Sequence, residues 1–203
     1  VDRLVGSEMC IRDSDKDVWP FKVKTDSGKE IQAETIIIAT GAQARWLGIE
    51  SEEKYNGKGV SACATCDGFF FKNKNVAVIG GGNTAVEEAL YLSNLCQKVT
   101  LIHRRDELRA EKILQNRLFD KKNINILWNN KVDDILGDDF GVNSLKLIST
   151  KDGSEKTIKI DGIFIAIGHD PSTLVFKNKI DLDQENYIIT VSYTHLTLPT
   201  NSS

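Results

Sequence analysis

The chain has 203 residues, enough for one ordinary domain or for one domain and pieces of another. With 40% hydrophobic and 27% charged residues and a formal charge of −3, it has the composition of a soluble globular protein and gives no reason to expect nucleic acid or an anionic membrane surface as a partner. No apolar run approaches the roughly 18 residues of a membrane-spanning helix, and four cysteines are too few and too scattered for a secreted disulfide scaffold. We therefore expect a cytoplasmic protein.

The two ends of the chain differ in pattern from the rest. Residues 1–14 show neither helical nor strand periodicity, and residues 192–203 alternate like a strand that leads nowhere. Both closely resemble peptides that arise when sequencing-adapter DNA is translated in frame. We expect them to be non-native and leave them out of the fold prediction.

The first predicted elements are a hairpin and a buried strand. Apolar and polar residues alternate over residues 18–25 and 31–34, with a turn between them, which predicts a β-hairpin. The unbroken apolar run that follows ends in Thr40 and Gly41, and it predicts a strand buried on both faces. Its glycine would let a ligand approach the backbone, although a plain tight turn explains these residues equally well.

The centre of the chain predicts a doubly wound parallel sheet. Short apolar strands are expected at residues 76–79, 99–102 and 124–127. Between them, residues 86–93 and 110–118 place apolar side chains at helical spacing, with Ala110, Ile113, Leu114 and Leu118 as the inward stripe of the second helix. The resulting β-α-β-α-β order is typical of an α/β fold with a doubly wound sheet.

Beyond this unit the period of the pattern changes to two. Residues 132–160 predict an antiparallel β-meander inserted into the α/β unit, with a hairpin turn at residues 151–154. Residues 162–168 form a fully apolar run ending in glycine, which predicts one more buried strand. Pro171 prevents a helix directly after it.

A glycine-rich motif follows the first strand of the α/β unit. Gly80-x-Gly82-x-x-Ala85 stands between a predicted strand and a predicted helix, which is the context that distinguishes a dinucleotide-binding turn from a chance match. Gly80 permits the sharp turn, Gly82 lets the backbone approach a pyrophosphate, and Ala85 is small enough for the helix to pack on the strand. The helix N-terminus then offers N–H groups and a partial positive charge to the phosphates.

The end of the second strand indicates which dinucleotide binds. A site for the unphosphorylated cofactor places an acidic side chain there, for the ribose 2′-hydroxyl. This chain instead has His103, Arg104 and Arg105, with Arg109 one helical turn beyond. Guanidinium groups bind a 2′-phosphate bidentately, so NADPH is favoured over NADH. The alternatives are a solvated basic surface for the arginines and a capping or packing role for His103.

A cysteine pair lies shortly before the glycine motif. Cys63-x-x-Cys66 is the spacing of a redox pair or of half a zinc site. Zinc needs a second ligand pair, which the sequence does not offer, so no metal is expected. Thiol–disulfide exchange needs a proton donor for the departing thiolate, and Asp67 is placed for that role next to Cys66. A turn-forming role for Asp67 and a purely structural disulfide remain open.

The chain resembles the bacterial-type low-molecular-weight thioredoxin reductases in four motifs, at residues 62–71, 78–85, 103–112 and 166–169. The similarity runs collinearly over about residues 18–191. In that family an FAD-binding domain is split in sequence around an NADPH-binding domain that carries the cysteine pair. Electrons pass from NADPH through FAD to the disulfide and on to thioredoxin.

This resemblance implies a domain organisation and an assembly. An NADPH-binding domain would span residues 46–171, between incomplete pieces of the FAD-binding domain at residues 15–45 and 172–191. The complete protein would be a homodimer that uses NADPH and FAD and has thioredoxin as its partner.

The resemblance also implies the site residues. Cys63 and Cys66 would form the redox pair, Asp67 would be the acid, and the strand ending at Thr40 and Gly41 would lie near FAD. The further residues implied in cofactor binding are Gly80, Gly82, Asn83, Thr84, Ala85, His103, Arg104, Arg105, Arg109, Ile167 and Gly168.

The chain departs from the family pattern in its flavin site. It has one dinucleotide fingerprint where the family has two, because the opening glycine-rich strand-turn-helix and the late Gly-Asp segment are missing. We expect a reductase fragment that binds NADPH, holds FAD poorly and turns over little. Two other functions remain open. One is an NADH-linked flavoprotein that feeds a peroxidase, against which Arg104 and Arg105 argue; the other is a non-catalytic NADPH-binding module, against which the cysteine pair argues.

Overall fold

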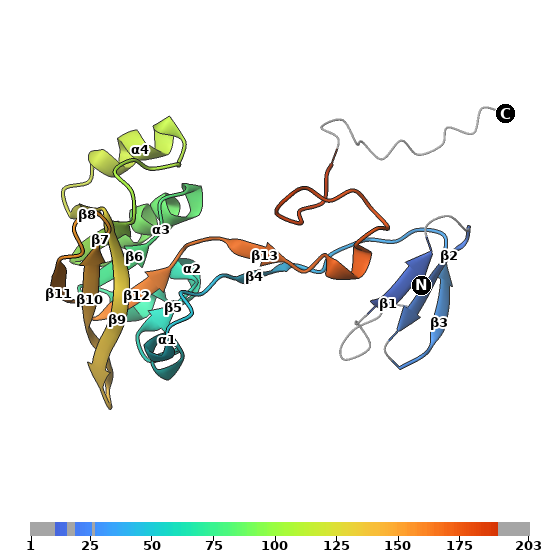
Figure 1. Ribbon diagram of the computed structural model, residues 1–203, viewed down its shortest axis with the longest axis horizontal. Helices are drawn as coiled ribbons and strands as arrows, with labels where there is room; N and C mark the ends of the chain where they lie inside the picture. The colour runs from blue at the N-terminus through green and yellow to red at the C-terminus, as the bar shows by residue number, and fades with distance from the viewer. Residues whose placement is uncertain (1–10, 16–18, 26, 191–203) are drawn as a thin grey trace. The chain divides into compact units, whose positions relative to one another are not determined.

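The structure is a computed structural model, and it describes residues 11–15, 19–25 and 27–190 (Figure 1). The chain divides into two compact units, one over Ala44–His169 and the other formed by the residues before and after it. Of the predicted non-native segments at residues 1–14 and 192–203, residues 1–10 and 192–203 lie outside the described residues, and residues 11–14 lie in strand β1 (Ile11–Asp15). No helix in the described part of the chain is long and apolar enough to cross a membrane.

A five-stranded parallel sheet forms the centre of the unit Ala44–His169. Its strands lie in the order β5-β12-β6-β7-β8, and each neighbouring pair is parallel. The predicted strands at residues 76–79, 99–102 and 124–127 are confirmed, and the last predicted strand ends earlier than expected. The bounds are β5 Val60–Ser61, β6 Asn75–Ile79, β7 Lys98–His103, β8 Ile124–Trp128 and β12 Gly162–Ile165.

Two helices make the connections of the doubly wound unit (Figure 1). Helix α3 (Asn83–Ser93) joins β6 to β7, and α4 (Lys112–Phe119) joins β7 to β8. Both pack against one face of the sheet, where apolar side chains of α3, α4 and alternate strand residues form one core cluster. The predicted α/β architecture is therefore confirmed.

The predicted inward stripe of the second helix is wrong at one position. Ile113 is 58% exposed, whereas Leu114 and Leu118 are buried. The third buried residue of α4 is Gln115, whose amide donates to the carbonyl of Ala110 at 2.7 Å. Because that hydrogen bond satisfies the polar amide, Gln115 can be buried next to Leu114. Ile113, on the other side of Leu114 in the sequence, faces water instead.

The predicted antiparallel meander is also confirmed. Its strands are β9 (Asn130–Asp138), β10 (Gly141–Ser149) and β11 (Glu155–Lys159), in the order β11-β10-β9. Their inward side chains, Leu145 and Leu147 among them, pack with apolar residues from the second face of the parallel sheet. The sheet is thus covered by helices on one face and by the meander on the other, which explains its continuous apolar strands.

Short elements connect these layers. Helix α1 (Glu50–Lys54) and helix α2 (Ala64–Asp67) flank β5, and a 3₁₀ turn, η2 (Gly68–Phe71), follows α2. Strands β4 (Ala42–Ala44) and β13 (His169–Pro171) pair with each other. A second 3₁₀ turn, η3, spans Leu174–Phe176.

The outer unit contains a small antiparallel sheet in the order β1-β2-β3. The hairpin of β2 (Phe21–Thr25) and β3 (Glu30–Ala33) confirms the prediction. Strand β1 (Ile11–Asp15) pairs with β2, although no strand was predicted there. An edge strand is held by backbone hydrogen bonds, so it forms without the alternation on which the prediction relied.

The predicted strand over residues 35–41 is wrong. The structure assigns no regular element to these residues, and Ile37 is 91% exposed. A strand buried on both faces needs paired neighbours and cover on each side. In the described part of the chain no strand pairs with this run, so its apolar side chains have nothing to pack against.

Candidate functional site

A pocket of about 700 Å³ opens at the carboxyl ends of β6, β7 and β12. In a doubly wound sheet this edge binds ligands at the point where the strand order reverses, which here lies between β6 and β12. Predicted site residues from three separate stretches of the sequence line this pocket together. They are Gly80, Gly82, Thr84, His103, Arg104, Arg109, Ile167 and Gly168.

The glycine turn after β6 forms one wall of the pocket. Gly80 has φ +150°, and a Cβ there would meet the Ala166 carbonyl and lie 2.7 Å from the Ala85 Cβ. Only glycine fits at that position. Around Gly82, by contrast, nothing lies within 4 Å of an added Cβ. The backbone at Gly82 is therefore open to a ligand, as the approach of a pyrophosphate requires.

The N-terminus of α3 adds a positive end to the same wall. Gly82 is the N-cap of α3 and has no side chain to bond the first N–H groups of the helix. Thr84, in the first turn, is exposed and lines the pocket. Backbone N–H groups at a helix start bind phosphate oxygens well, so the residues present fit the pyrophosphate of a dinucleotide.

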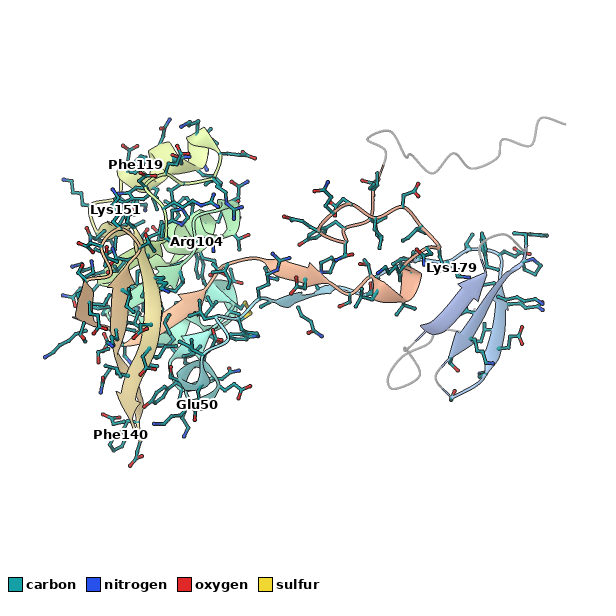
Figure 2. All side chains as sticks on the ribbon, in the orientation of Figure 1. Glu50, Arg104, Phe119, Phe140, Lys151 and Lys179 are labelled. Atoms are coloured by element: carbon teal, nitrogen blue, oxygen red, sulfur yellow. A yellow bond between two sulfur atoms is a disulfide. The ribbon has the colours of Figure 1, made fainter. Side chains whose placement is uncertain are left out.

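The arginines lie differently around the pocket. Arg104, which is labelled in Figure 2, is the first residue after β7. Arg104 and Arg109 are exposed, and both line the pocket. Arg105 is also exposed, but it does not line the pocket. The backbone N–H of Arg109 donates to the Gly81 carbonyl at 2.8 Å. This hydrogen bond joins the loop of residues 104–111, called here the arginine loop, to the glycine turn.

His103 is mainly a packed residue at the end of β7. It is 6% exposed, its Nε2 lies 3.0 Å from the Glu107 carbonyl oxygen, and its ring leaves no room for a side chain at Gly81. Burial lowers the pKa of His103, against hydrogen bonds to the backbone that raise it. The ring therefore lines the pocket as a neutral group that supports the glycine turn.

Ala85 and Asn83, like Arg105, are predicted cofactor residues that do not line the pocket. Ala85 is fully buried beneath Gly80, in the packing role that its size predicts. Asn83 points to the neighbouring loop, where its Oδ1 accepts from the backbone N–H of Glu111 at 2.8 Å and its Nδ2 donates to Glu111 Oε1 at 3.3 Å.

Sequence reasoning missed a second group of residues that line the pocket. They come from the segment after β4 and from the start of β9, and no motif marks either stretch. Only the fold brings them to the glycine turn, because the meander covers the sheet face beside it. They are Arg45, Trp46, Leu47, Ile49, Asn130, Lys131, Val132 and Asp133.

Asp133 is the one acid among the described residues that line the pocket. Its Oδ2 lies 3.1 Å from Lys146 Nζ, which also lies 3.0 Å from Glu155 Oε2. Such an exposed ion pair contributes little stability. It does offset the negative charge that would face an anionic ligand, so the pocket keeps a positive balance.

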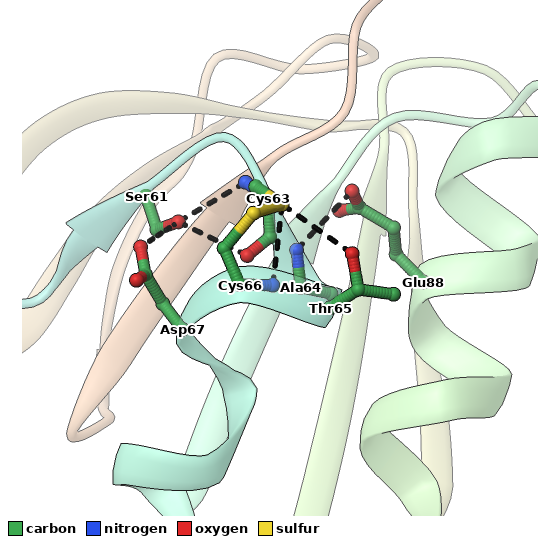
Figure 3. Close-up of a disulfide and its surroundings, with 7 residues drawn as sticks. All are labelled: Ser61, Cys63, Ala64, Thr65, Cys66, Asp67 and Glu88. Atoms are coloured by element: carbon green, nitrogen blue, oxygen red, sulfur yellow. Dashed lines mark hydrogen bonds between the residues drawn. A yellow bond between two sulfur atoms is a disulfide. The ribbon is translucent and has the colours of Figure 1, made fainter.

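The cysteine pair forms a disulfide on the surface of the same unit (Figure 3). Cys63 is the N-cap of α2, and its Sγ accepts from the Cys66 N–H at 3.2 Å. Cys63 is half-buried and Cys66 is exposed. Cys66 is thus the sulfur that an external thiol or disulfide reaches first.

Asp67 is tied to the disulfide through Ser61, which sequence reasoning missed (Figure 3). The Ser61 hydroxyl donates to Asp67 Oδ2 at 2.6 Å and accepts from the Cys63 N–H at 3.0 Å. Ser61 is buried at the end of β5. The carboxyl group is therefore held beside the cysteine backbone by a short polar chain, as a proton donor near the disulfide requires.

Glu88 approaches the disulfide from the opposite side (Figure 3). Its Oε1 accepts from the Ala64 N–H at 3.4 Å, and its Oε2 is buried without a hydrogen-bond partner among the described residues. Burial raises the pKa of Glu88, partly opposed by the Ala64 hydrogen bond. Its position three residues after Ala85 and four before Leu92 on the inward face of α3 was the available signal.

The remaining predicted residues, Thr40 and Gly41, belong to the outer unit. Both are exposed, and Gly41 has φ +70°, a conformation that favours glycine. The Gly41 carbonyl accepts from the Ser172 N–H at 3.0 Å. These residues have no regular secondary structure and lie directly before β4, and they stay a predicted flavin contact.

Three proteins with similar sequences or structures bear one name, thioredoxin reductase. The curated thioredoxin reductase of Rickettsia conorii is 52% identical over 195 residues, which cover 94% of this chain and 63% of that protein. The thioredoxin reductase of Coxiella burnetii is 51% identical over 181 residues, covering 88% and 56% respectively. The crystal structure of Lactococcus lactis thioredoxin reductase superposes with a TM-score of 0.78 at 40% identity, covering 93% of this chain and 62% of that one.

The chain thus spans about three-fifths of the length of these relatives. The expected resemblance to low-molecular-weight thioredoxin reductases is confirmed. Residues 5–200 match the family described as pyridine nucleotide-disulphide oxidoreductase, with the glycine turn, arginine loop and disulfide inside that range. This chain belongs to the pyridine nucleotide-disulphide oxidoreductase family.

Proposed function

We propose that the complete protein is a thioredoxin-disulfide reductase, which passes electrons from NADPH through FAD to the Cys63–Cys66 disulfide and on to thioredoxin. The observation that carries this proposal is that one folded unit holds both an arginine-lined dinucleotide pocket and an exposed disulfide beside a carboxyl group. Relatives about 50% identical that bear the name thioredoxin reductase support it.

The pocket is proposed to hold NADPH along the glycine turn. The Gly82 backbone and the first N–H groups of α3 bind the pyrophosphate, and Arg104 and Arg109 bind the 2′-phosphate. Arg105 adds positive charge at the rim. The other pocket-lining residues proposed to contact the cofactor are Gly80, Thr84, His103, Ile167 and Gly168. Asn83 and Ala85 belong to the proposed site as supports of the glycine turn that do not line the pocket.

The disulfide is proposed to act by thiol–disulfide exchange. Bound NADPH and FAD supply the two electrons that reduce the pair to a dithiol. The exposed Cys66 thiolate then attacks a disulfide of thioredoxin, Cys63 resolves the mixed disulfide, and the S–S bond between the two cysteines re-forms. Asp67 donates a proton to the departing thiolate. FAD contact at Thr40 and Gly41, a homodimer and a cytoplasmic location belong to the same proposal.

Nucleotide titration tests the cofactor half of this proposal. The chain is titrated with NADPH and with NADH in a calorimeter at fixed ionic strength. One or two charge-assisted hydrogen bonds to the 2′-phosphate, at about 1.5–3 kcal/mol each, make NADPH about ten- to a thousand-fold tighter. Equal affinities would overturn the NADPH assignment and favour an NADH-linked flavoprotein.

A second assay tests the redox half. The full-length gene product is given NADPH, FAD and thioredoxin, and thioredoxin thiols are measured. Three single variants, Cys63→Ser, Cys66→Ser and Cys96→Ser, are compared with the unchanged protein. Cys96→Ser is the control, because Cys96 is a buried free cysteine. Loss of turnover in the first two variants only supports the proposal. A full-length protein that binds NADPH but leaves thioredoxin oxidised would support a non-catalytic NADPH-binding module.

A further inference from the structure

The loop that carries Arg109 is fixed at consecutive backbone groups. The N–H of Arg109 donates to the Gly81 carbonyl at 2.8 Å, and the N–H of Glu111 donates to Asn83 Oδ1, also at 2.8 Å. Between them, the carbonyl of Ala110 accepts from the Gln115 amide at 2.7 Å. These contacts join the arginine loop to the glycine turn on one side and to α4 on the other.

Asn83 is the side chain at the centre of this arrangement. It is the first residue of α3, and Glu111 is the N-cap of α4, so a single carboxamide links the starts of two helices. Both ends of the Asn83 carboxamide bond Glu111: the oxygen accepts at 2.8 Å and the nitrogen donates at 3.3 Å. Asn83 does not line the pocket, whereas Arg109 does.

The position of Arg109 depends on its own backbone. The Arg109 side chain makes no hydrogen bond to another described residue, and the loop between β7 and α4 has no regular secondary structure at Arg109. Holding a guanidinium where a phosphate will sit lowers the ordering cost of binding. The contacts of Gly81, Asn83 and Gln115 fix the backbone from which the Arg109 side chain extends, and so limit the positions that its guanidinium can take.

We propose that Asn83 is a positioning residue for cofactor selectivity: it binds Glu111 and so holds the Arg109 guanidinium at the place of the 2′-phosphate. This inference rests on the proposed function, because it concerns the same NADPH pocket. It differs from a direct role, in which the Asn83 amide contacts the pyrophosphate common to NADPH and NADH. If Asn83 acts through Arg109, its removal weakens NADPH alone and selectivity falls. If it contacts the pyrophosphate, its removal weakens both nucleotides equally and selectivity stays the same.

A double-mutant cycle separates these roles. Affinities for NADPH and NADH are measured by calorimetry on the chain, on Asn83→Ala, on Arg109→Ala and on the double variant. If Asn83 acts through Arg109, Asn83→Ala weakens NADPH about tenfold, a coupling within the range for residues in one network, and leaves NADH unchanged. In the Arg109→Ala background, Asn83→Ala then has no further effect on NADPH.

Matched variants control for folding. Asn94→Ala makes the same chemical change at the other end of α3, where Asn94 bonds the Leu90 carbonyl, and it should change neither affinity. Asn83→Ser keeps a good helix-starting residue but cannot reach the Glu111 N–H, so it should reproduce the selectivity loss even if Asn83→Ala folds poorly. Melting temperatures of all variants are recorded alongside.

The outcomes are distinct. Equal losses of NADPH and NADH affinity in Asn83→Ala, or a loss that persists in the Arg109→Ala background, would overturn the positioning role and leave the NADPH assignment intact. Unchanged selectivity in both Asn83 variants would also overturn it. An unchanged chain that binds the two nucleotides equally would overturn the proposed NADPH site and this inference together.

Discussion

The candidate dinucleotide pocket and the disulfide belong to one unit, but backbone shapes the first and side chains hold the second. At the glycine turn the pocket wall consists of backbone atoms, shaped by Gly80 and Gly82, and the strands β6 and β12 beneath it are buried. The disulfide lies on the four-residue helix α2, and side chains hold it in place. We therefore expect pocket substitutions to change stability and affinity, and substitutions near the disulfide to change rates and pH dependence.

The largest effect is expected for Gly80→Ala. The new methyl group would meet the Ala166 carbonyl and the Ala85 side chain, at a backbone φ of +150°. Overpacking and backbone strain together lower the free energy of unfolding by about 3–5 kcal/mol. Urea unfolding measures this.

Gly82→Ala is the matched control for that substitution. Nothing lies within 4 Å of a Cβ at Gly82, so only the weaker helix cap of alanine remains, and the free energy of unfolding should fall by about 1 kcal/mol or less. NADPH affinity should still fall, because the methyl group occupies the space of the pyrophosphate. Equal destabilisation by both substitutions would contradict the close-approach argument for Gly80.

Arg104→Gln is expected to have the next largest effect. Arg104 lines the pocket, and losing one charge-assisted hydrogen bond should weaken NADPH about ten- to a hundred-fold while leaving NADH unchanged. Calorimetric titration measures both affinities. Arg117→Gln, an exposed arginine of α4 that does not line the pocket, is the control. A similar selectivity loss in that control would mean that general surface charge, not Arg104, distinguishes the nucleotides.

Ser61→Ala tests the side chains that hold the disulfide. It removes the 2.6 Å hydrogen bond to Asp67 and the acceptor for the Cys63 N–H. Reaction of the reduced pair with a small aromatic disulfide should slow by about tenfold, which corresponds to about 1.4 kcal/mol, and NADPH affinity should not change. Thr65→Ala, an exposed hydroxyl beside Cys63, is the control. An unchanged exchange rate in Ser61→Ala would remove Asp67 from the exchange step.

The sequence predicted the pocket better than the surroundings of the disulfide for a physical reason. A glycine turn between a strand and a helix is fixed by local constraints, such as the clash at Gly80, and these can be read from adjacent residues. Ser61 and Trp46 carry no such constraint. They reach their sites only because β5 pairs with β12 and the segment after β4 lies at the glycine turn.

The apolar run of residues 35–41 shows the limit of pattern reasoning. Its sequence is that of a buried strand, yet Ile37 is 91% exposed. Burial of a strand depends on what lies beside it, which the run itself does not encode. The helix pattern around Ile113 failed for a related reason, because a hydrogen-bonded Gln115 took the inward position.

The smallest effect is expected for Glu88→Gln. Burial raises the pKa of Glu88 above its ordinary value of 4.5, so the folded chain holds that proton more tightly than the unfolded chain does. The stability that this proton contributes is fully present below pH 4.5 and is lost as the pH rises through the raised pKa. An amide of the same shape does not ionise, so the variant should gain stability relative to the unchanged chain as the pH rises above 4.5.

The gain should be modest, on the order of 2 °C in Tm, because Glu88 is only half-buried and water screens its charge. Thermal unfolding followed at several pH values measures it, with Glu87→Gln on the exposed face of α3 as the control. If the melting temperatures of the two variants change with pH in the same way, the Glu88 carboxyl is solvated like that of Glu87. The disulfide would then lie near one carboxyl group held within the fold, that of Asp67. A profile that diverges only for Glu88→Gln would instead mean that the disulfide lies between two carboxyl groups in different surroundings: Asp67 is bonded to the Ser61 hydroxyl, and burial raises the pKa of Glu88.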